Sequence, residues 1–257
     1  MKILAIGDIV GSPGRAMIRD FLSSIREKLE VDLCIANGEN AAAGNGITRS
    51  IAYELLDNGV DVITMGNHVW GKKDIFRLFD EKLPIIRPAN YPPGTPGRGH
   101  IIVNIKNTKV AIVNLAGRVY LENLDCPFRV IEHELKYIKK LANIIIVDFH
   151  AEATSEKVAM GWYLDGKVSA VFGTHTHVQT ADERILQKGT AYITDIGMTG
   201  PYNSILGVRK EIIINRFIRH LPEKFEVAEG PVQFNGILLE IDEPTGKAKS
   251  INRIVIK

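Results

Sequence analysis

The sequence predicts an α/β fold in a single domain covering residues 1–257. In the first part of the chain, short apolar runs typical of buried parallel strands alternate with segments of helical spacing. In the last part, strand-like segments follow one another with only one helix among them, which favours antiparallel pairing. No internal repeat, low-complexity tract or linker divides the chain.

The first part is expected to consist of strand–helix units. Gly11-Ser12-Pro13-Gly14 predicts a turn before the first helix, Thr48 can cap the second helix, and Asn58-Gly59 is a stop signal for it. The expected strands cover residues 2–6, 32–36 and 60–65, and the expected helices cover 16–29, 48–58 and 72–81.

The remaining elements follow from the same patterns. A hairpin is expected across Asn107-Thr108, with strands over 101–105 and 110–115. Next come a helix over 127–141, a very apolar strand over 144–147, a helix over 155–164 and a strand over 168–172. The last elements are strands over 191–196, 232–241 and 251–256, with a helix over 211–220.

Composition excludes several classes of protein. The net charge is only +2 and no segment is densely basic, so a stable nucleic-acid duplex partner is not expected. Cys34 and Cys126 are far apart, which argues against a thiolate metal site and a disulfide framework and favours a reducing cytoplasm. No apolar run reaches membrane-spanning length, and the N-terminal run is too short for a signal peptide. We therefore expect a cytoplasmic protein without a membrane partner.

A His-x-His pair follows the expected strand at 168–172. Side chains two residues apart in an extended segment point the same way, so His175 and His177 are expected to leave the strand end side by side, with Gly173 permitting the bend. Two neutral imidazoles in this position can bind a metal ion. Alone the pair is weak support for a metal site, because histidines near a core are often only hydrogen-bonded.

Metal-type side chains follow five expected strands, each at the carboxyl end. In open α/β sheets these ends meet at one edge, so the side chains should converge. Each has an ordinary explanation in turn geometry, backbone hydrogen bonding or core packing, but five such coincidences are less plausible than one site. The set is Asp8, Glu39 with Asn40, Asn67 with His68, His150, and His175 with His177.

The mixture of carboxylates, amides and imidazoles suits Mn, Fe, Co, Ni or Zn. There are enough ligands for two ions, with a carboxylate bridging them. Two ions about 3.5–4 Å apart can clamp a phosphoryl group and generate hydroxide near neutral pH.

The order of these residues resembles the calcineurin-like metallophosphoesterases. Their motifs run Asp-x-His, Gly-Asp, Gly-Asn-His, His and Gly-His-x-His. Here they read Gly7-Asp8-Ile9-Val10, Asn37-Gly38-Glu39-Asn40, Gly66-Asn67-His68, His150 and Gly173-Thr174-His175-Thr176-His177. Val10 replaces the first histidine and Glu39 replaces the bridging aspartate, while Asn40 is placed to fill the vacant position.

These departures are typical of the bacterial YmdB-type phosphodiesterases, which the chain resembles almost from end to end. The segments 148–157 and 194–201 carry much of the resemblance. It implies a calcineurin-like fold of two packed mixed β-sheets flanked by helices (αββα). It also implies two transition-metal ions, with iron favoured and manganese or zinc as alternatives, hydrolysis of 2′,3′-cyclic nucleotides, a homo-oligomer and a regulatory role in bacteria.

The resemblance also implies roles for individual residues. Asp8, Glu39, Asn40 and His177 would hold one ion, and Glu39, Asn67, His150 and His175 the other. A hydroxide bridging the ions would attack phosphorus, and His68 would protonate the leaving oxygen. Arg118 and Arg15 are candidate phosphate contacts, although the interpretation of both as surface arginines is the stronger one.

Other functions are open from the sequence. A phosphomonoesterase of the same superfamily is one, and a metal-binding regulatory protein that acts through partners is another. The segment Gly7 to Gly14 also follows a strand, as a dinucleotide-binding turn does, but it lacks the close glycine pair and contains Pro13.

Overall fold

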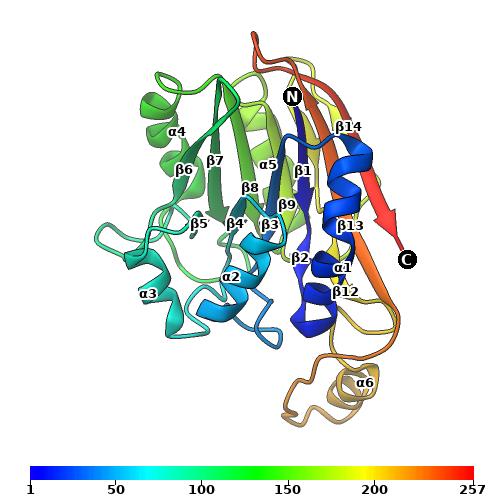
Figure 1. The fold of residues 1–257 in the computed structure, drawn as a ribbon. Coiled ribbons are helices and arrows are strands. Elements are labelled where there is room, and N and C mark those ends of the chain that lie inside the picture. The colour runs from blue at the N-terminus through cyan, green and yellow to red at the C-terminus, as the bar shows by residue number, and fades with distance from the viewer.

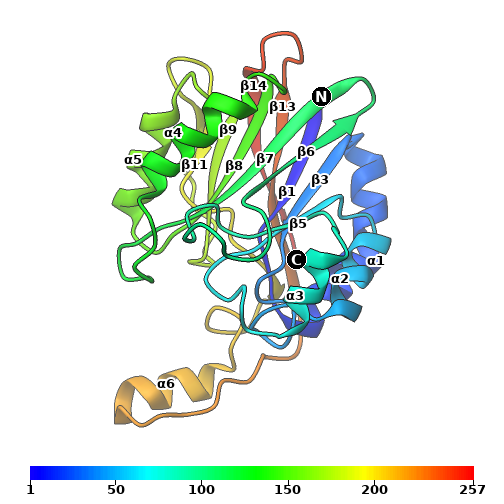
Figure 2. The same ribbon diagram turned by 90° about the vertical axis from the view of Figure 1, so that its left-hand side faces the viewer.

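The computed structural model describes all residues, 1–257. Two β-sheets pack face to face, and helices cover both outer faces (Figure 1). The four layers are clearest in Figure 2, where α4 and α5 lie on one side of the paired sheets and α1, α2 and α3 on the other. The predicted αββα architecture is therefore confirmed.

The first sheet contains the strand–helix units of the first part of the chain. Its order is β2-β12-β13-β1-β3-β4-β5, with β14 paired to β13. The β1–β3, β3–β4 and β4–β5 pairs are parallel, whereas β13 is antiparallel to β1. The bounds are β1 Lys2–Ile6, β2 Asp8–Ile9, β3 Leu33–Asn37, β4 Val62–Thr64, β5 Ile85–Ile86, β12 Met198–Pro201, β13 Val232–Ile241 and β14 Ala248–Ile256.

The second sheet has the order β10-β11-β9-β8-β7-β6. The predicted hairpin is present as the antiparallel β6–β7 pair, while β7, β8 and β9 run parallel. The bounds are β6 His100–Ile105, β7 Thr108–Ala116, β8 Ile144–His150, β9 Ala170–Thr174, β10 Arg184–Ile185 and β11 Ala191–Ile193.

Helices α1 to α5 flank the sheets, and α6 stands away from them at the bottom of Figures 1 and 2. Thr48 caps α2 as predicted, because its hydroxyl accepts a hydrogen bond from the Ile51 N–H. No helix has both the length and the apolar character needed to span a membrane. The bounds are α1 Gly11–Leu29, α2 Arg49–Asp57, α3 Asp74–Asp80, α4 Pro127–Ile138, α5 Thr154–Leu164 and α6 Lys210–Arg219.

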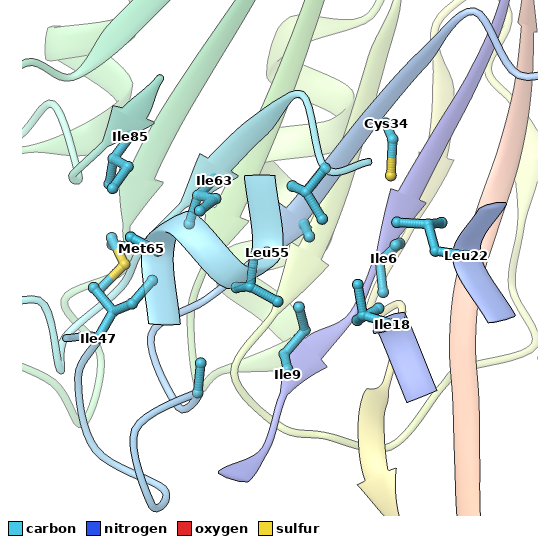
Figure 3. Close-up of a cluster of buried hydrophobic side chains, with 14 of the residues drawn as sticks. Ile6, Ile9, Ile18, Leu22, Cys34, Ile47, Leu55, Ile63, Met65 and Ile85 are labelled. Atoms are coloured by element: carbon cyan, nitrogen blue, oxygen red, sulfur yellow. The ribbon is translucent and has the colours of Figure 1, made fainter. Parts of the chain in front are cut away.

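Burial on both faces explains why the strands are continuously apolar. In β1, Leu4 and Ile6 point into the core under α1 and α2, while Ile3 and Ala5 point into the core between the sheets. Figure 3 shows the first of these cores, in which Ile18 and Leu22 of α1 pack over the sheet.

One predicted turn is wrong. Residues 11–14 form the first turn of α1, which tolerates Pro13 because the N–H groups there lack helical partners. Gly14 is needed for a different reason. A Cβ at Gly14 would lie 2.4 Å from the Thr199 carbonyl oxygen, so the glycine lets α1 lie directly against β12.

Candidate metal centre

The five predicted ligand segments meet at one edge of the paired sheets. Asp8 begins β2 directly after β1, and Glu39 and Asn67 follow β3 and β4 in the first sheet. His150 is the last residue of β8, and His175 follows β9 in the second sheet. Because all five parent strands end at this edge, the expected convergence occurs and joins the two sheets (Figure 1).

One group of side chains forms around His150. Its Nε2 lies 2.9 Å from Asn67 Oδ1, 3.1 Å from His175 Nδ1 and 3.2 Å from Glu39 Oε1. The ligand atoms of Glu39, His150 and His175 all lie within 4.8 Å of one another, a spacing that one metal ion can bridge. The group is one of the two ligand sets expected from the sequence.

A second group forms around Asn40. Its Nδ2 lies 3.2 Å from Glu39 Oε1, 3.2 Å from His177 Nε2 and 3.4 Å from Asp8 Oδ1. Asp8 Oδ1 and His177 Nε2 are 3.6 Å apart. These residues correspond to the other expected set, and Glu39 is the residue common to both groups.

Each ligand imidazole has one nitrogen in the cluster and the other against an outer partner. His150 Nδ1 lies 2.9 Å from Thr174 Oγ1, and His177 Nδ1 lies 3.0 Å from the Leu206 carbonyl oxygen. His175 is reversed, with Nε2 lying 3.0 Å from Glu152 Oε2. When the outer nitrogen carries the proton, the inner nitrogen presents its lone pair to the cluster, as in metal-ligating histidines generally.

Buried carboxylates and imidazoles shift one another's pKa values. Burial lowers the pKa of His150. The charge of Glu39 and its hydrogen bond act in the opposite direction and together outweigh burial, so that the pKa rises to about 9. Burial raises the pKa of Glu39, but the charge and hydrogen bond of His150 outweigh it and hold it well below the ordinary value. Burial, together with the His150 charge, lowers the pKa of His175 to about 4.

The turn carrying the last two histidines differs from the prediction in its geometry. Gly173 does not supply the bend, because it stays within β9, while His175 and His177 themselves take positive φ values of 95° and 63°. Gly173 is needed for space: a Cβ there would lie 1.8 Å from the Thr194 carbonyl oxygen. The two imidazoles do not stay side by side but diverge, His175 toward His150 and His177 toward Asp8.

His68 lies against the cluster, and its Nδ1 is 3.2 Å from Glu39 Oε1, the oxygen that both groups share. Its Nδ1 is 2.9 Å from Asn40 Oδ1, and its backbone N–H donates to Glu39 Oε2 at 2.9 Å. The side chain is 39% exposed, so a substrate can reach it. Trp70, two residues further along the chain, stacks on Phe76 with the ring centroids 5.5 Å apart.

The structure treats the two candidate phosphate-binding arginines differently. Arg15 is engaged within the fold, since Nε pairs with Glu54 at 2.9 Å and Nη1 donates to the Ala41 carbonyl oxygen at 2.7 Å. Arg118 is exposed and lines a cavity of about 630 Å³. It follows Gly117, whose N–H donates to the His150 carbonyl oxygen at 2.9 Å.

Several residues that shape the centre escaped the sequence reasoning. The buried Asp148 accepts a 2.7 Å hydrogen bond from Thr174 Oγ1, the hydroxyl that faces His150. A Cβ at Gly66 would lie 2.3 Å from Glu39 Oε2, so only glycine lets β4 end against the cluster. Asp148 and Glu152 flank His150 in sequence, which is the signal that could have found them. Nothing local marks Leu206, because its backbone carbonyl is the contacting group.

The donor set fits a transition-metal pair. Two buried carboxylates, an amide oxygen and three imidazole nitrogens face one another in two groups that share Glu39, and neither carboxylate is paired with a lysine or arginine. Asn40 can present Oδ1 to the cluster after a half-turn of its amide, which exchanges the places of its oxygen and nitrogen.

Comparison with known proteins agrees with this geometry. The family described as YmdB-like protein matches residues 4–254. The chain belongs to the YmdB-like family. The 2′,3′-cyclic-nucleotide 2′-phosphodiesterase of Bacillus subtilis is 52% identical over 256 residues, which are 100% of this chain and 97% of that protein.

Two solved structures have nearly the same fold as this YmdB-like chain. A hypothetical protein from Thermus thermophilus is 42% identical, with a TM-score of 0.95 over 100% of this chain and 99% of the other. A structure described as a novel phosphatase from Mycoplasma pneumoniae is 38% identical, with a TM-score of 0.94 over 100% and 93% of the two chains. The chain therefore has the calcineurin-like fold that the sequence motifs predicted.

Proposed function

We propose that this protein is a metal-dependent phosphodiesterase that hydrolyses 2′,3′-cyclic nucleotides to nucleoside monophosphates. The observation that carries the proposal is the division of the ligands into two groups that share Glu39. The similarity to the 2′,3′-cyclic-nucleotide 2′-phosphodiesterase of Bacillus subtilis supports the choice of substrate. Cyclic nucleotides or other small phosphodiesters would be the substrates.

Two metal ions would occupy the two groups. Asp8, Glu39, Asn40 and His177 would hold one, and Glu39, Asn67, His150 and His175 would hold the other. We propose iron, with manganese or zinc as alternatives, because imidazole with carboxylate suits all three. When bound, such a pair lowers the pKa of water and neutralises charge on phosphoryl oxygens.

Residues of the chain would supply the proton transfer and a contact to the phosphate. A proton on His68 Nδ1 would be donated to Glu39 Oε1, which lies 3.2 Å away, so that the Nε2–H is left for the substrate. Water would add to phosphorus and lose one proton to solvent, one P–O bond of the cyclic diester would break, and the imidazolium form of His68 would give its Nε2 proton to the departing ribose oxygen and be left neutral. The exposed Arg118 would contact a phosphoryl oxygen.

The decisive experiment combines metal analysis with a substrate panel. Freshly purified protein should contain close to two transition-metal ions per chain and hydrolyse 2′,3′-cyclic AMP. Glu39→Gln removes the shared negative charge and should depress both metal occupancy and turnover. Full two-metal occupancy in this variant would contradict the bridging role, and metal-independent activity would contradict the whole mechanism.

A phosphomonoesterase is the second candidate, favoured by the description of the Mycoplasma pneumoniae structure as a phosphatase. Including nucleoside monophosphates in the same panel separates the two, since faster release of phosphate from monoesters than hydrolysis of cyclic diesters would favour it. The homo-oligomer, the regulatory role and the cytoplasmic location are further proposals that rest on the family resemblance. A metal-replete protein inactive on every phosphoester would instead favour a metal-binding regulator acting through partners.

A further inference from the structure

The turn between His175 and His177 is strained and needs support from its surroundings. Both histidines have φ values, 95° and 63°, in the region that residues with a Cβ rarely adopt. Such conformations are costly and persist only where neighbouring contacts over-determine them. Thr176 lies between the two histidines, so whatever fixes Thr176 fixes both.

Asp195 supplies the support. Its Oδ2 accepts hydrogen bonds from the Thr176 N–H at 3.1 Å and from the Thr176 hydroxyl at 2.7 Å. Its Oδ1 accepts from the Gly197 N–H at 2.8 Å, which anchors the carboxylate to the chain leading into β12. Hydrogen bonds to an ionised carboxylate are about twice as strong as neutral ones, so this acceptor is well suited to hold a strained backbone.

A buried carboxylate requires a cation, and Lys157 of α5 provides it. Its Nζ lies 2.6 Å from Asp195 Oδ2, and the two residues are only 1% and 0% exposed. The lysine stem runs past Gly173, where a Cβ would lie 2.9 Å from Lys157 Cδ. The pair therefore lies beside the end of β9.

We propose that the buried Lys157–Asp195 pair is the positioning device for the His175–His177 turn, and that it sets the metal affinity of both ligand groups. The inference rests on the proposed metal centre, and assigns neither residue a contact with substrate. Stability alone does not account for a buried ion pair, because apolar or neutral replacements of similar volume are often neutral or stabilising. The orientation of two ligands does account for it.

The test uses the full-length protein stripped of metal. In Lys157→Met/Asp195→Asn both charges are removed together at nearly constant volume, so no unpaired charge remains. The melting temperature of the metal-free variant should stay near that of the wild type. Its affinity for Mn²⁺, measured by titration calorimetry, should fall about 10–100-fold, as for other residues that orient metal ligands. Raising the Mn²⁺ concentration should restore kcat, because the reacting groups are intact.

A matched control removes another ion pair that has no contact with the ligands. Arg26 and Asp61 are 3.0 Å apart and link α1 to the segment before β4. Arg26→Met/Asp61→Asn should leave the Mn²⁺ affinity unchanged. Thr176→Val keeps the ion pair and loses the contact of the Thr176 hydroxyl with Asp195. It should weaken Mn²⁺ binding by a smaller factor than the double variant does. If the double variant does not fold, the Mn²⁺ affinity of Thr176→Val decides whether the positioning role holds.

The outcomes are distinct. A folded double variant that binds Mn²⁺ as the wild type does, or a Thr176→Val protein of unchanged affinity, overturns the positioning role. Lost activity that excess Mn²⁺ does not restore overturns it as well. A wild-type protein that binds none of Mn²⁺, Zn²⁺ or iron overturns the proposed function, and this inference with it. A wild-type protein that binds metal without hydrolysing cyclic nucleotides leaves the affinity comparison to decide this inference alone.

Discussion

His68 Nδ1 lies 2.9 Å from Oδ1 of the proposed ligand Asn40 and 3.2 Å from Glu39 Oε1, whereas its other ring nitrogen has no partner within the cluster. This placement suits a proton donor that is separate from metal binding. General acid catalysis contributes roughly 10²–10⁴-fold, so His68→Ala should keep both metals and lose about that much kcat on a cyclic nucleotide. The defect should shrink on a nitrophenyl phosphodiester, whose leaving group departs without protonation. Metal content, melting temperature and kcat from one preparation test the assignment. Wild-type turnover of the cyclic nucleotide would contradict it.

His150 makes metal uptake dependent on pH. Its pKa in the metal-free fold is raised, chiefly by Glu39 against the opposing effect of burial, from 6.5 to about 9. Because the folded value is the higher one, the imidazolium–Glu39 pair stabilises the metal-free fold fully below about pH 6.5, and this stability is lost as the pH rises through about 9.

A metal ion must displace that proton. We expect Mn²⁺ affinity to increase with pH up to about 9, and the binding heat near neutral pH to depend on the ionisation enthalpy of the buffer. Calorimetry in two buffers of matched pH measures the released proton. Uptake without proton release would contradict this account of the His150–Glu39 pair.

At the scale of elements, the cap of α2 contributes stability without contributing chemistry. The Thr48 hydroxyl accepts from the Ile51 N–H, one of the helix N–H groups that lacks a backbone partner. Thr48→Ala should lower the free energy of unfolding by about 1 kcal/mol, measured by urea denaturation, while metal affinity stays unchanged. Thr48→Ser keeps an acceptor oxygen and serves as the control. A large loss of metal binding in the alanine variant would show that α2 is coupled to the centre.

Strands buried on both faces were the elements that the sequence predicted best. β1, β3 and β8 have apolar runs that end close to where the structure ends them, so the residues following them could be placed at one edge. β2, β5, β10 and β12 were missed, because strands of two to four residues carry no periodicity of their own. Met198 pairs with Asp8 across nearly the whole chain, and no local pattern encodes such a partner.

The same distinction holds within the centre. Side chains of ligand type at strand ends could be found by residue type and position, as His150 and His177 show. The groups that hold these side chains in place could not be found in this way. The Leu206 carbonyl oxygen has no side-chain signature, and Lys157 lies in an ordinary helical segment. The divergence of His175 and His177 follows from their positive φ values, which the sequence does not indicate because neither residue is a glycine.

At the scale of the molecule, we propose that residues 1–257 form one domain, because the core between the sheets draws on strands from both ends of the chain. Ile3 and Leu239 lie in that core together and pair across β1 and β13. A chain ending at residue 231 lacks β13 and β14 and should neither unfold cooperatively nor retain metal. A chain ending at residue 247 lacks only β14 and keeps the partner of β1, so it should be less impaired. Equal metal content in the full and the shorter truncated chain would contradict the single-domain proposal.

The antiparallel pairing of β1 with β13 also bears on how the protein is made. β1 is synthesised before β13, the strand with which it pairs: Lys2 pairs with Glu240 and Ile6 with Gly236. Asp8 follows shortly after β1, so its position depends on a strand that is made more than 200 residues later. We therefore expect metal loading to follow the emergence of β13 from the ribosome. Stalled nascent chains still holding β13 in the exit tunnel should bind no metal, and chains extended by a C-terminal linker should bind it.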